Sequence, residues 1–164
     1  MVNFLSIARI VASTSVDGPG LRSALYLQGC LLRCPGCHNH ELWDVRGGER
    51  RNISDVADEL LATGENISIL GGEPLLQYEG LLELCRTIKK KSDRTIWIWT
   101  GYELPYVEFF YGELLKYVDV IVDGPFIKEF ALPNLKWRGS TNQKVWEILH
   151  SSADNTINIR QIYN

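Results

Sequence analysis

The chain has 164 residues, of which 45% are hydrophobic and 23% are charged, and its net charge at pH 7 is −3. This length is typical of one compact domain, so we expect a single domain over residues 1–164. Because acidic residues outnumber basic ones, a broad nucleic-acid-binding surface is excluded. The apolar runs are too short to span a membrane and residues 1–4 show no secretory signal, which predicts a cytoplasmic protein without membrane or nucleic-acid partners.

Apolar residues and turn residues alternate along the chain in the manner of strand–helix units. The first expected strand covers residues 21–27 and ends at a Gln-Gly turn. After a cysteine-rich loop, Asn52 is a suitable N-cap for a helix whose apolar stripe runs over residues 53–61 and which ends at Gly64. Residues 67–70 are expected to form a buried strand that leads directly into a Gly-Gly-Glu-Pro sequence.

The same alternation continues towards the C-terminus, although the last forty residues are less regular. The remaining expected elements are a helix over residues 81–91, a strand over 95–100, a helix over 106–117, a strand over 118–122 and short strands near 145–149 and 157–162. Cys85 lies on the apolar stripe of the first of these helices, which predicts a packed core thiol rather than a ligand.

Strands that alternate with helices predict a parallel sheet with right-handed crossovers. A complete eight-unit barrel needs about 250 residues, and this chain supplies roughly half to two-thirds of that length. We therefore expect an α/β fold in which parallel strands with outer helices form a partial, open TIM-type barrel. Ligands bind at the C-terminal ends of such strands, where the sequence places four unusual loops: residues 30–37, 71–74, 100–102 and 123–125.

Three of the four cysteines lie within eight residues, at Cys30, Cys34 and Cys37. In a cytoplasmic protein such a group indicates metal ligands rather than disulfides. Thiolate ligands favour an iron–sulfur cluster or zinc. Three cysteines leave one corner of a four-iron cluster without a protein ligand, and an open position on a metal is where chemistry takes place. The alternative is a zinc loop completed by His38 or His40.

The cysteine spacing, together with Gly71-Gly72-Glu73-Pro74 after the second strand, resembles the radical S-adenosylmethionine (SAM) superfamily. The motifs that narrow the resemblance are Asp17-Gly18-Pro19-Gly20, Cys37-His38-Asn39 with Trp43, Thr100-Gly101-Tyr102, Asp123-Gly124-Pro125 and residues 137–143. In this order they resemble glycyl-radical-enzyme activases, and among these the activating proteins of anaerobic ribonucleoside-triphosphate reductases. Two departures are Leu70, where Ser often precedes the glycines, and His40, where Pro often follows Cys-His-Asn and where a histidine could approach the metal.

The resemblance implies the radical SAM fold in shortened form and a pair of cofactors. Cys30, Cys34 and Cys37 would bind three irons of a [4Fe–4S] cluster, and the amino and carboxylate groups of SAM would bind the fourth. One electron from a flavodoxin or ferredoxin would cleave SAM to methionine and a 5′-deoxyadenosyl radical. This radical would abstract hydrogen from a glycine of the anaerobic ribonucleoside-triphosphate reductase, so the chain is expected to be an oxidoreductase.

Several residues receive a cofactor-binding role from the same resemblance. Those expected to contact SAM are Gly71, Gly72 and Glu73 at its methionyl end and Gly36, Cys37 and His38 along its adenine. Glycines permit the close approach of ligand and backbone that such a loop requires. Without the cysteines, the Gly-Gly-Glu-Pro sequence would be interpreted as an ordinary strand–helix turn.

Three polar residues keep two interpretations each. Asp123 either accepts hydrogen bonds from the ribose hydroxyls of SAM or caps the turn that follows it. Asp17 either helps to hold the glycine-bearing segment of the reductase or begins its own turn. Arg138 either pairs with a carboxylate of that partner or lies in a surface ion pair.

Other functions fit parts of the pattern. An activase of another glycyl-radical enzyme, such as a formate-lyase type, would share the cysteine motif, but those chains are usually longer and residues 137–143 argue against it. A small-molecule enzyme of the same superfamily, such as a 7-deazaguanine-pathway synthase, is a further alternative. From a different class, a non-catalytic binding module stabilised by zinc or a cluster would also use the cysteines.

Overall fold

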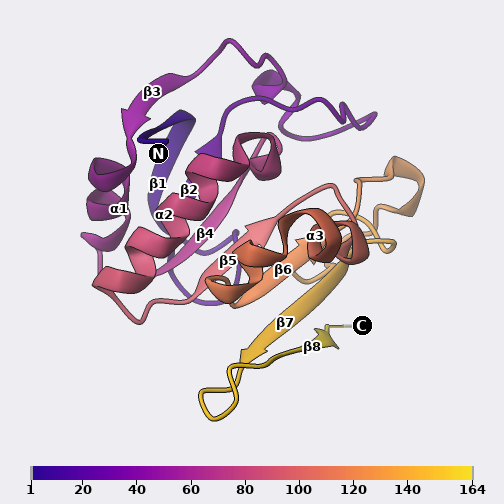
Figure 1. Cartoon of the computed structure of the whole chain (residues 1–164). Coiled ribbons are helices and arrows are strands. Elements are labelled where there is room, and N and C mark those ends of the chain that lie inside the picture. The colour runs from indigo at the N-terminus through magenta and orange to yellow at the C-terminus, as the bar shows by residue number, and fades with distance from the viewer. Residues whose placement is uncertain (1, 164) are drawn as a thin grey trace.

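The computed structural model describes residues 2–163 of the chain. In this part of the chain the framework is one sheet with helices packed against it (Figure 1). In their order across the sheet, the strands are β3 (Glu49–Asn52), β1 (Phe4–Thr14), β2 (Arg22–Leu27), β4 (Asn66–Gly71), β5 (Ile96–Trp99), β6 (Val120–Asp123), β7 (Lys144–His150) and β8 (Ile157–Ile162). The α-helices are α1 (Ile53–Leu61), α2 (Tyr78–Lys91) and α3 (Leu104–Tyr111).

The centre of the sheet is parallel and its flanks are antiparallel. β2, β4, β5 and β6 pair in parallel, which confirms the predicted strand–helix units. β1 and β3 on one flank, and β7 and β8 on the other, pair in antiparallel fashion. The expectation of parallel strands is therefore correct only for the four central ones, and the fold is a mixed α/β sheet.

Side chains alternate between the two faces of the sheet, as the pleat of extended chains requires. Leu25, Ile69, Ile98 and Ile121 occupy neighbouring positions across the four central strands and belong to the main apolar core. Trp97, one position before Ile98, belongs to a smaller cluster on the opposite face. The two faces therefore carry separate apolar clusters.

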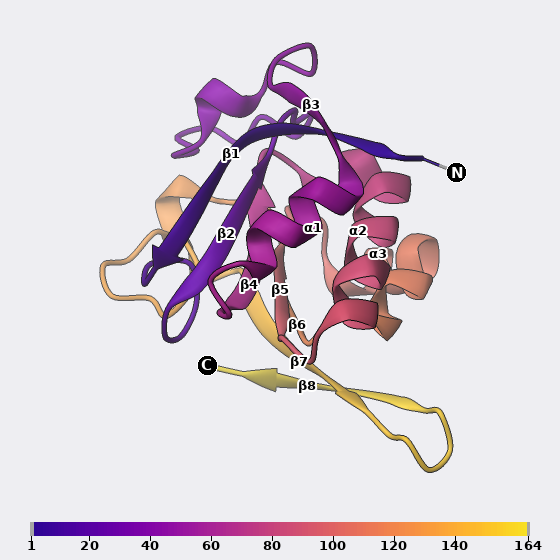
Figure 2. The same ribbon diagram turned by 90° about the vertical axis from the view of Figure 1, so that its left-hand side faces the viewer.

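The helices cover the first of these faces (Figure 2). The predicted cap of α1 is confirmed, because the side chain of Asn52 accepts a hydrogen bond from the backbone N–H of Ser54 at 2.9 Å. Val56 and Leu60 on its inner side are fully buried. Cys85 of α2 is also fully buried, so the predicted core thiol is confirmed, and its burial raises its pKa to about 12.

Some elements differ from those expected. The helix predicted over residues 106–117 is shorter, since α3 is followed by a 3-10 helix over Gly112–Lys116. The predicted C-terminal strands are confirmed as the β7–β8 hairpin. Neither β1 nor β3 was predicted. β3 has a polar sequence and pairs with β1 alone. No helix among the described residues is both long and apolar enough to cross a bilayer.

Candidate active site

The cysteine loop begins where β2 ends. The backbone N–H of Cys30 donates a hydrogen bond to the carbonyl of Trp43 at 3.3 Å, which fastens the start of the loop to the turn that follows it. Between Cys34 and Cys37 the chain turns back at Gly36, whose φ of +78° favours glycine. Local backbone geometry therefore brings the three cysteines into one short loop.

The three thiols open onto a common cavity of about 160 Å³. All three are free, and the burial of Cys30 raises its pKa. The other residues that line this cavity come from the ends of neighbouring strands and include Gly71, Gly72, Glu73, Thr100, Gly101, Gly124, Phe126 and Gln143. The prediction that the loops after the four parallel strands gather on one rim is confirmed.

Gly71 and Gly72 allow the loop after β4 to pack directly on the cysteine loop. A Cβ on Gly71 would lie 2.4 Å from the backbone nitrogen of Leu27, and one on Gly72 would lie 2.1 Å from the carbonyl oxygen of Gly29. These distances are far below van der Waals contact. No residue with a side chain can occupy either position without moving the backbone.

Glu73 joins two of the strand-end loops. Its carboxylate accepts hydrogen bonds from the backbone N–H of Leu75 at 3.0 Å, the hydroxyl of Thr100 at 2.8 Å and the backbone N–H of Gly101 at 2.8 Å. Its side chain is almost fully buried, and this desolvation raises its pKa. Glu73 lines the cavity, but its direct contact with SAM stays a prediction.

Asp123 is a buried cap. One carboxylate oxygen accepts from the backbone N–H of Leu104 at 2.7 Å, at the start of α3, and the other accepts from the backbone N–H of Lys144 at 3.1 Å. The capping role considered for this residue is thus present, although it serves α3 and β7 rather than the Gly-Pro turn. A ribose contact stays a prediction, and only the neighbouring Gly124 lines the cavity.

The donor set suits an iron–sulfur cluster, because each of the three free thiols can take a separate iron. Among the described residues, no group of three or more His, Cys, Asp or Glu side chains is arranged to hold a metal ion. A zinc ion needs its ligands to meet at one point, whereas a cluster takes each thiolate on a separate iron. His40 lies against the carbonyl of Cys37, at 3.3 Å from its Nδ1 atom, instead of joining the thiols.

Comparison with known proteins decides between these interpretations. Residues 16–146 match the model of a family described as 4Fe-4S single cluster domain. The anaerobic ribonucleoside-triphosphate reductase-activating protein of Vibrio cholerae is 38% identical over 140 residues, which are 79% of this chain and 90% of that protein. Its counterparts in Haemophilus influenzae and Enterobacteria phage T4 are 37% and 36% identical, over 78% and 84% of this chain and 88% and 91% of theirs.

The chain belongs to the family of anaerobic ribonucleoside-triphosphate reductase-activating proteins. It is an enzyme with a 4Fe–4S single cluster domain.

A second, larger cavity of about 730 Å³ adjoins the first in this activating protein. Cys37 and Trp99 line both cavities, whereas Asp17, Trp137 and Arg138 line only the larger one. The structure thus brings together two predicted partner-binding residues that lie far apart in the sequence. His38 also lines this cavity, with its ring centroid 5.8 Å from that of Phe126.

Arg138 makes hydrogen bonds to two backbone carbonyls. Its Nη1 atom donates to the carbonyl oxygens of Gln143 at 3.3 Å and Tyr163 at 2.8 Å. Its Nε atom and the indole nitrogen of Trp137 are buried without a hydrogen-bond partner among the described residues. Both groups therefore retain a donor next to the larger cavity.

The loop of Asp17 is held by residues that sequence reasoning missed. The Asp17 carboxylate accepts from the hydroxyl of Tyr26 at 2.8 Å, and its backbone carbonyl accepts from the hydroxyl of Ser68. The buried guanidinium of Arg22 in turn donates to Ser68 at 2.7 Å and lies 5.2 Å from the ring centre of Trp97. The signal available in the sequence was Arg22 itself, a charged residue at the start of a fully buried strand that is mostly apolar.

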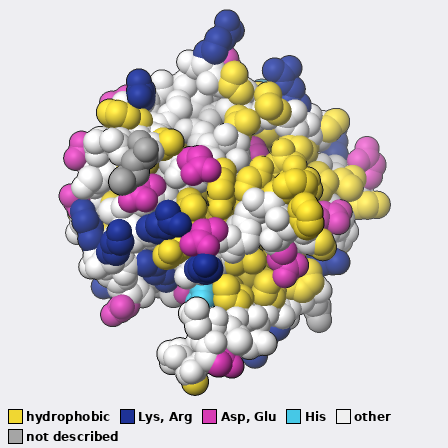
Figure 3. Space-filling model, in the orientation of Figure 1, with side chains coloured by type: hydrophobic (Ala, Val, Ile, Leu, Met, Phe, Trp, Pro, Cys, Tyr) yellow, Lys and Arg dark blue, Asp and Glu magenta, His cyan; other side chains and the backbone are white. Residues whose placement is uncertain are grey.

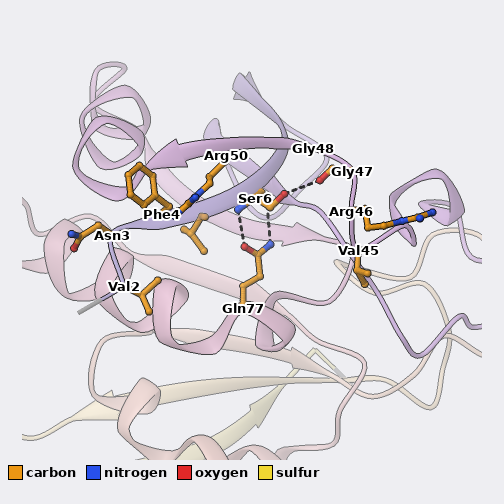
Figure 4. Close-up of a pocket in the computed structure, with 11 residues that line it drawn as sticks. Val2, Asn3, Phe4, Ser6, Val45, Arg46, Gly47, Gly48, Arg50 and Gln77 are labelled. Carbon is orange, nitrogen blue, oxygen red and sulfur yellow. Dashed lines mark hydrogen bonds between the residues drawn. The ribbon is translucent and has the colours of Figure 1, made fainter.

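Gln77 was also missed, and it anchors the segment that follows the two glycines (Figure 4). Its side-chain oxygen accepts from the backbone N–H of Ser6 at 2.7 Å. Its side-chain nitrogen donates to the carbonyls of Ser6 at 2.8 Å and Gln28 at 2.9 Å. The hollow beside it in Figure 4 is separate from the cysteine cavity, and Gln77 has a structural role there.

Proposed function

We propose that this chain, acting as a single domain over residues 1–164, installs a glycyl radical on an anaerobic ribonucleoside-triphosphate reductase by reductive cleavage of SAM. The observation that carries the proposal is the cysteine loop, whose three thiols open onto a cavity walled by Gly71 and Gly72. The named relatives, which share more than a third of their residues with it, support the same activity. We place the protein in the cytoplasm.

Cys30, Cys34 and Cys37 would hold three irons of a [4Fe–4S] cluster. When bound, the reduced cluster and SAM supply a 5′-deoxyadenosyl radical that can abstract hydrogen from a glycine Cα. Cys30 is buried, whereas Cys34 and Cys37 are half-buried, so the bound cofactor and partner would complete the exclusion of water from this point. The chain's own contribution is thus to bind, to orient and to exclude solvent.

The strand-end loops would position SAM. Gly71 and Gly72 present bare backbone to the cavity, which suits the charged methionyl end. Glu73 fixes the distance between this loop and the loop after β5 through its hydrogen bonds with Thr100 and Gly101. Gly36 and His38 belong to the segment proposed to lie along the adenine, and Asp123 remains the proposed partner of the ribose.

The larger cavity would receive the glycine-bearing segment of the reductase. It adjoins the cysteine cavity through Cys37 and Trp99, so a segment lying in it would come close to the reacting atoms. The side chains of Asp17 and Arg138, which both line this cavity, would accept and donate hydrogen bonds to the segment. The electron would come from a carrier protein of the flavodoxin or ferredoxin type.

The test is anaerobic reconstitution with iron and sulfide, followed by reduction and addition of SAM. We expect 5′-deoxyadenosine and methionine to form, and a glycyl-radical doublet in the electron paramagnetic resonance spectrum when the reductase is present. Cleavage of SAM without that doublet would point to another radical SAM enzyme. Tight zinc binding without cluster absorption or SAM cleavage would point to the binding module.

A further inference from the structure

The connection between β6 and β7, over residues 124–143, forms part of the wall of both cavities of the site. The structure describes all of this connection, which consists of loops and a short 3-10 helix over Lys128–Phe130. Phe126 and Gln143 line both cavities, whereas residues 137–139 line only the larger one. Each end of the connection therefore places one side chain at the junction of the two cavities.

The outer part of this connection is not packed against the rest of the molecule. Residues 128–134 are all exposed. In Figure 3, hydrophobic and charged side chains lie together at the edge of the molecule where this connection lies in Figure 1. A loop without a packed outer surface keeps its shape through the hydrogen bonds of its inner part. The shape of the shared wall therefore depends on the polar side chains inside the connection.

The side-chain amide of Gln143 holds the two ends of the connection together. Its oxygen accepts hydrogen bonds from the backbone N–H of Gly139 at 2.8 Å and of Ser140 at 3.1 Å. Its nitrogen donates to the backbone carbonyl of Gly124 at 2.9 Å. A glutamine amide accepts at one atom and donates at the other, whereas an ionised carboxylate only accepts and an aliphatic side chain does neither. The amide therefore matches both ends of the connection.

The ring of Phe126 packs on the backbone that Gln143 holds. A Cβ on Gly139 would lie 2.9 Å from the Cδ2 atom of this ring, so the ring touches the Gly139 backbone directly. The ring centroid of Phe126 also lies 5.8 Å from that of His38, the residue after the proposed cluster ligand Cys37. The place of the ring at the junction of the cavities therefore follows from the hydrogen bonds of Gln143.

The neighbouring Asn142 joins the same two segments without lining either cavity. Its side-chain nitrogen donates to the backbone carbonyl of Pro125 at 2.8 Å. Gln143 and Asn142 thus make the same kind of bond between the same parts of the chain, but only Gln143 stands at the junction. A comparison of the two separates the shape of the junction from the general firmness of the connection.

We infer that Gln143 is a positioning residue, which sets the junction of the two cavities and so keeps SAM cleavage coupled to hydrogen abstraction from the partner's glycine. The inference rests on the proposed function. In a coupled turnover one electron cleaves one SAM, and the 5′-carbon then takes a hydrogen atom from the glycine Cα. One methionine, one 5′-deoxyadenosine and one glycyl radical result.

Hydrogen transfer of this kind needs the two carbons close together and aligned, and an error of about 1 Å costs much of the rate. When the junction shifts, the glycine Cα lies too far from the 5′-carbon. The 5′-carbon then takes hydrogen from the S–H bond of a thiol in the buffer, which leaves a thiyl radical and yields 5′-deoxyadenosine without a glycyl radical. The ratio of these two products therefore reports on the junction.

The experiment compares Gln143→Met with the matched control Asn142→Leu, since each removes an amide and keeps the approximate size of the side chain. The reconstituted full chain is mixed with the reductase, SAM, dithionite and dithiothreitol. Chromatography measures 5′-deoxyadenosine, and electron paramagnetic resonance measures the glycyl radical. We expect the amount of 5′-deoxyadenosine per glycyl radical to rise about fivefold or more in Gln143→Met and to stay within about twofold of the wild type in Asn142→Leu.

Two further measurements accompany the product ratio. Calorimetry with the chain before reconstitution measures the dissociation constant of the reductase, which should rise a few-fold in Gln143→Met alone. Urea unfolding shows whether each variant is folded. Gln143→Glu keeps the acceptor for Gly139 and Ser140 and loses the donor to Gly124, so it should also raise the product ratio and serves where Gln143→Met does not fold.

Two results would overturn the inference. One is a wild-type product ratio in a folded variant of Gln143. The other is an equal rise of the ratio in Asn142→Leu, which would show that any loosening of the connection has this effect. Failure of the wild-type chain to form 5′-deoxyadenosine or the glycyl radical would instead contradict the proposed function, so the two failures are distinguishable.

Discussion

The two adjoining cavities differ in the residues that line them. The cysteine cavity has four glycines in its lining, and at two of them, Gly71 and Gly72, a Cβ would overlap neighbouring peptide groups. The larger cavity has one glycine, Gly139, and is also lined by the side chains of Trp137 and Arg138 and by a loop that contains Asn134 at a φ of +68°. A side chain at Gly71 or Gly72 would displace the backbone, whereas the side chains of the larger cavity can change rotamer.

This difference matches the two ligands proposed. A cofactor that must be cleaved at one bond needs fixed surroundings, because small errors of position cost much of the rate. A segment of a partner protein brings its own shape and gains from side chains that can adjust to it. Substitutions in the first cavity should therefore have larger effects than those in the second.

The largest effect is expected for the proposed cluster ligands. Cys30→Ala, Cys34→Ala and Cys37→Ala should each abolish SAM cleavage and the absorption of the reconstituted cluster, because a three-thiolate site loses a ligand. The control is Cys85→Ala, at the buried thiol of α2, which should retain cleavage. Loss of cleavage in the control at normal stability would show that the ligands are wrongly assigned.

The next largest effect is expected for Gly72→Ala. The new methyl group would overlap the carbonyl of Gly29, so we expect a stability loss of about 1–3 kcal/mol or more and a loss of most SAM cleavage. Gly112→Ala is the matched control, since no atom lies within 4 Å of its Cβ position. Urea unfolding and 5′-deoxyadenosine assays measure both effects, and equal behaviour of the two variants would contradict the close approach.

A smaller effect is expected for Glu73→Gln. The Glu73 carboxylate accepts three hydrogen bonds, but one of the two oxygens becomes an NH₂ group in the variant. That group would face a donor, so at least one buried donor would lose its acceptor, at a cost of about 1–3 kcal/mol. Chemical denaturation should show this loss, and SAM cleavage should fall with it. Glu79→Gln, at an exposed position of α2, should change stability by less than about 0.5 kcal/mol.

The smallest effect is expected for Tyr26→Phe at the second cavity. Burial, followed by the hydrogen bond to Asp17, raises the pKa of Tyr26 to about 12 from 10.0. The folded protein therefore holds the Tyr26 proton more tightly than the unfolded chain does. Wild-type stability should fall as the pH rises from 10 towards 12, because the unfolded chain loses this proton first. The variant should lose part of this slope and show a few-fold weaker activation of the reductase, with dithionite-driven SAM cleavage unchanged. Unfolding curves at several pH values measure the slope, and an identical slope in the variant would contradict the assignment.

Local sequence patterns were sufficient for the centre of the fold. The apolar run of β4 and its Gly-Gly ending predicted both a buried strand and a strand-end loop, because each signal depends on near neighbours in the chain. β3 could not be found in this way. Its Glu-Arg-Arg-Asn sequence has no apolar face, and it is a strand only because its backbone pairs with β1.

The site was predictable to the extent that its residues are close in sequence. The spacing of the cysteines and of the two glycines predicted these loops, and the resemblance to a known family added the roles of their residues in cofactor binding. The meeting of Asp17 and Arg138 at one cavity depends on how the β1–β2 loop and the segment before β7 pack, which no local pattern encodes. The same applies to Asp123, whose cap joins α3 to β7.

The main-chain hydrogen bonds between the two glycine-containing loops have a thermodynamic consequence. Gly72 N–H donates to Leu27 and Glu73 N–H donates to Gly29, both at 2.8 Å, so the loop proposed to hold the cluster and the loop proposed to hold the methionyl end of SAM are joined by direct hydrogen bonds. Whatever orders one loop lowers the entropy cost of ordering the other. Occupancy of the thiols should therefore tighten cofactor binding, and by reciprocity the cofactor should tighten metal binding by the same free energy.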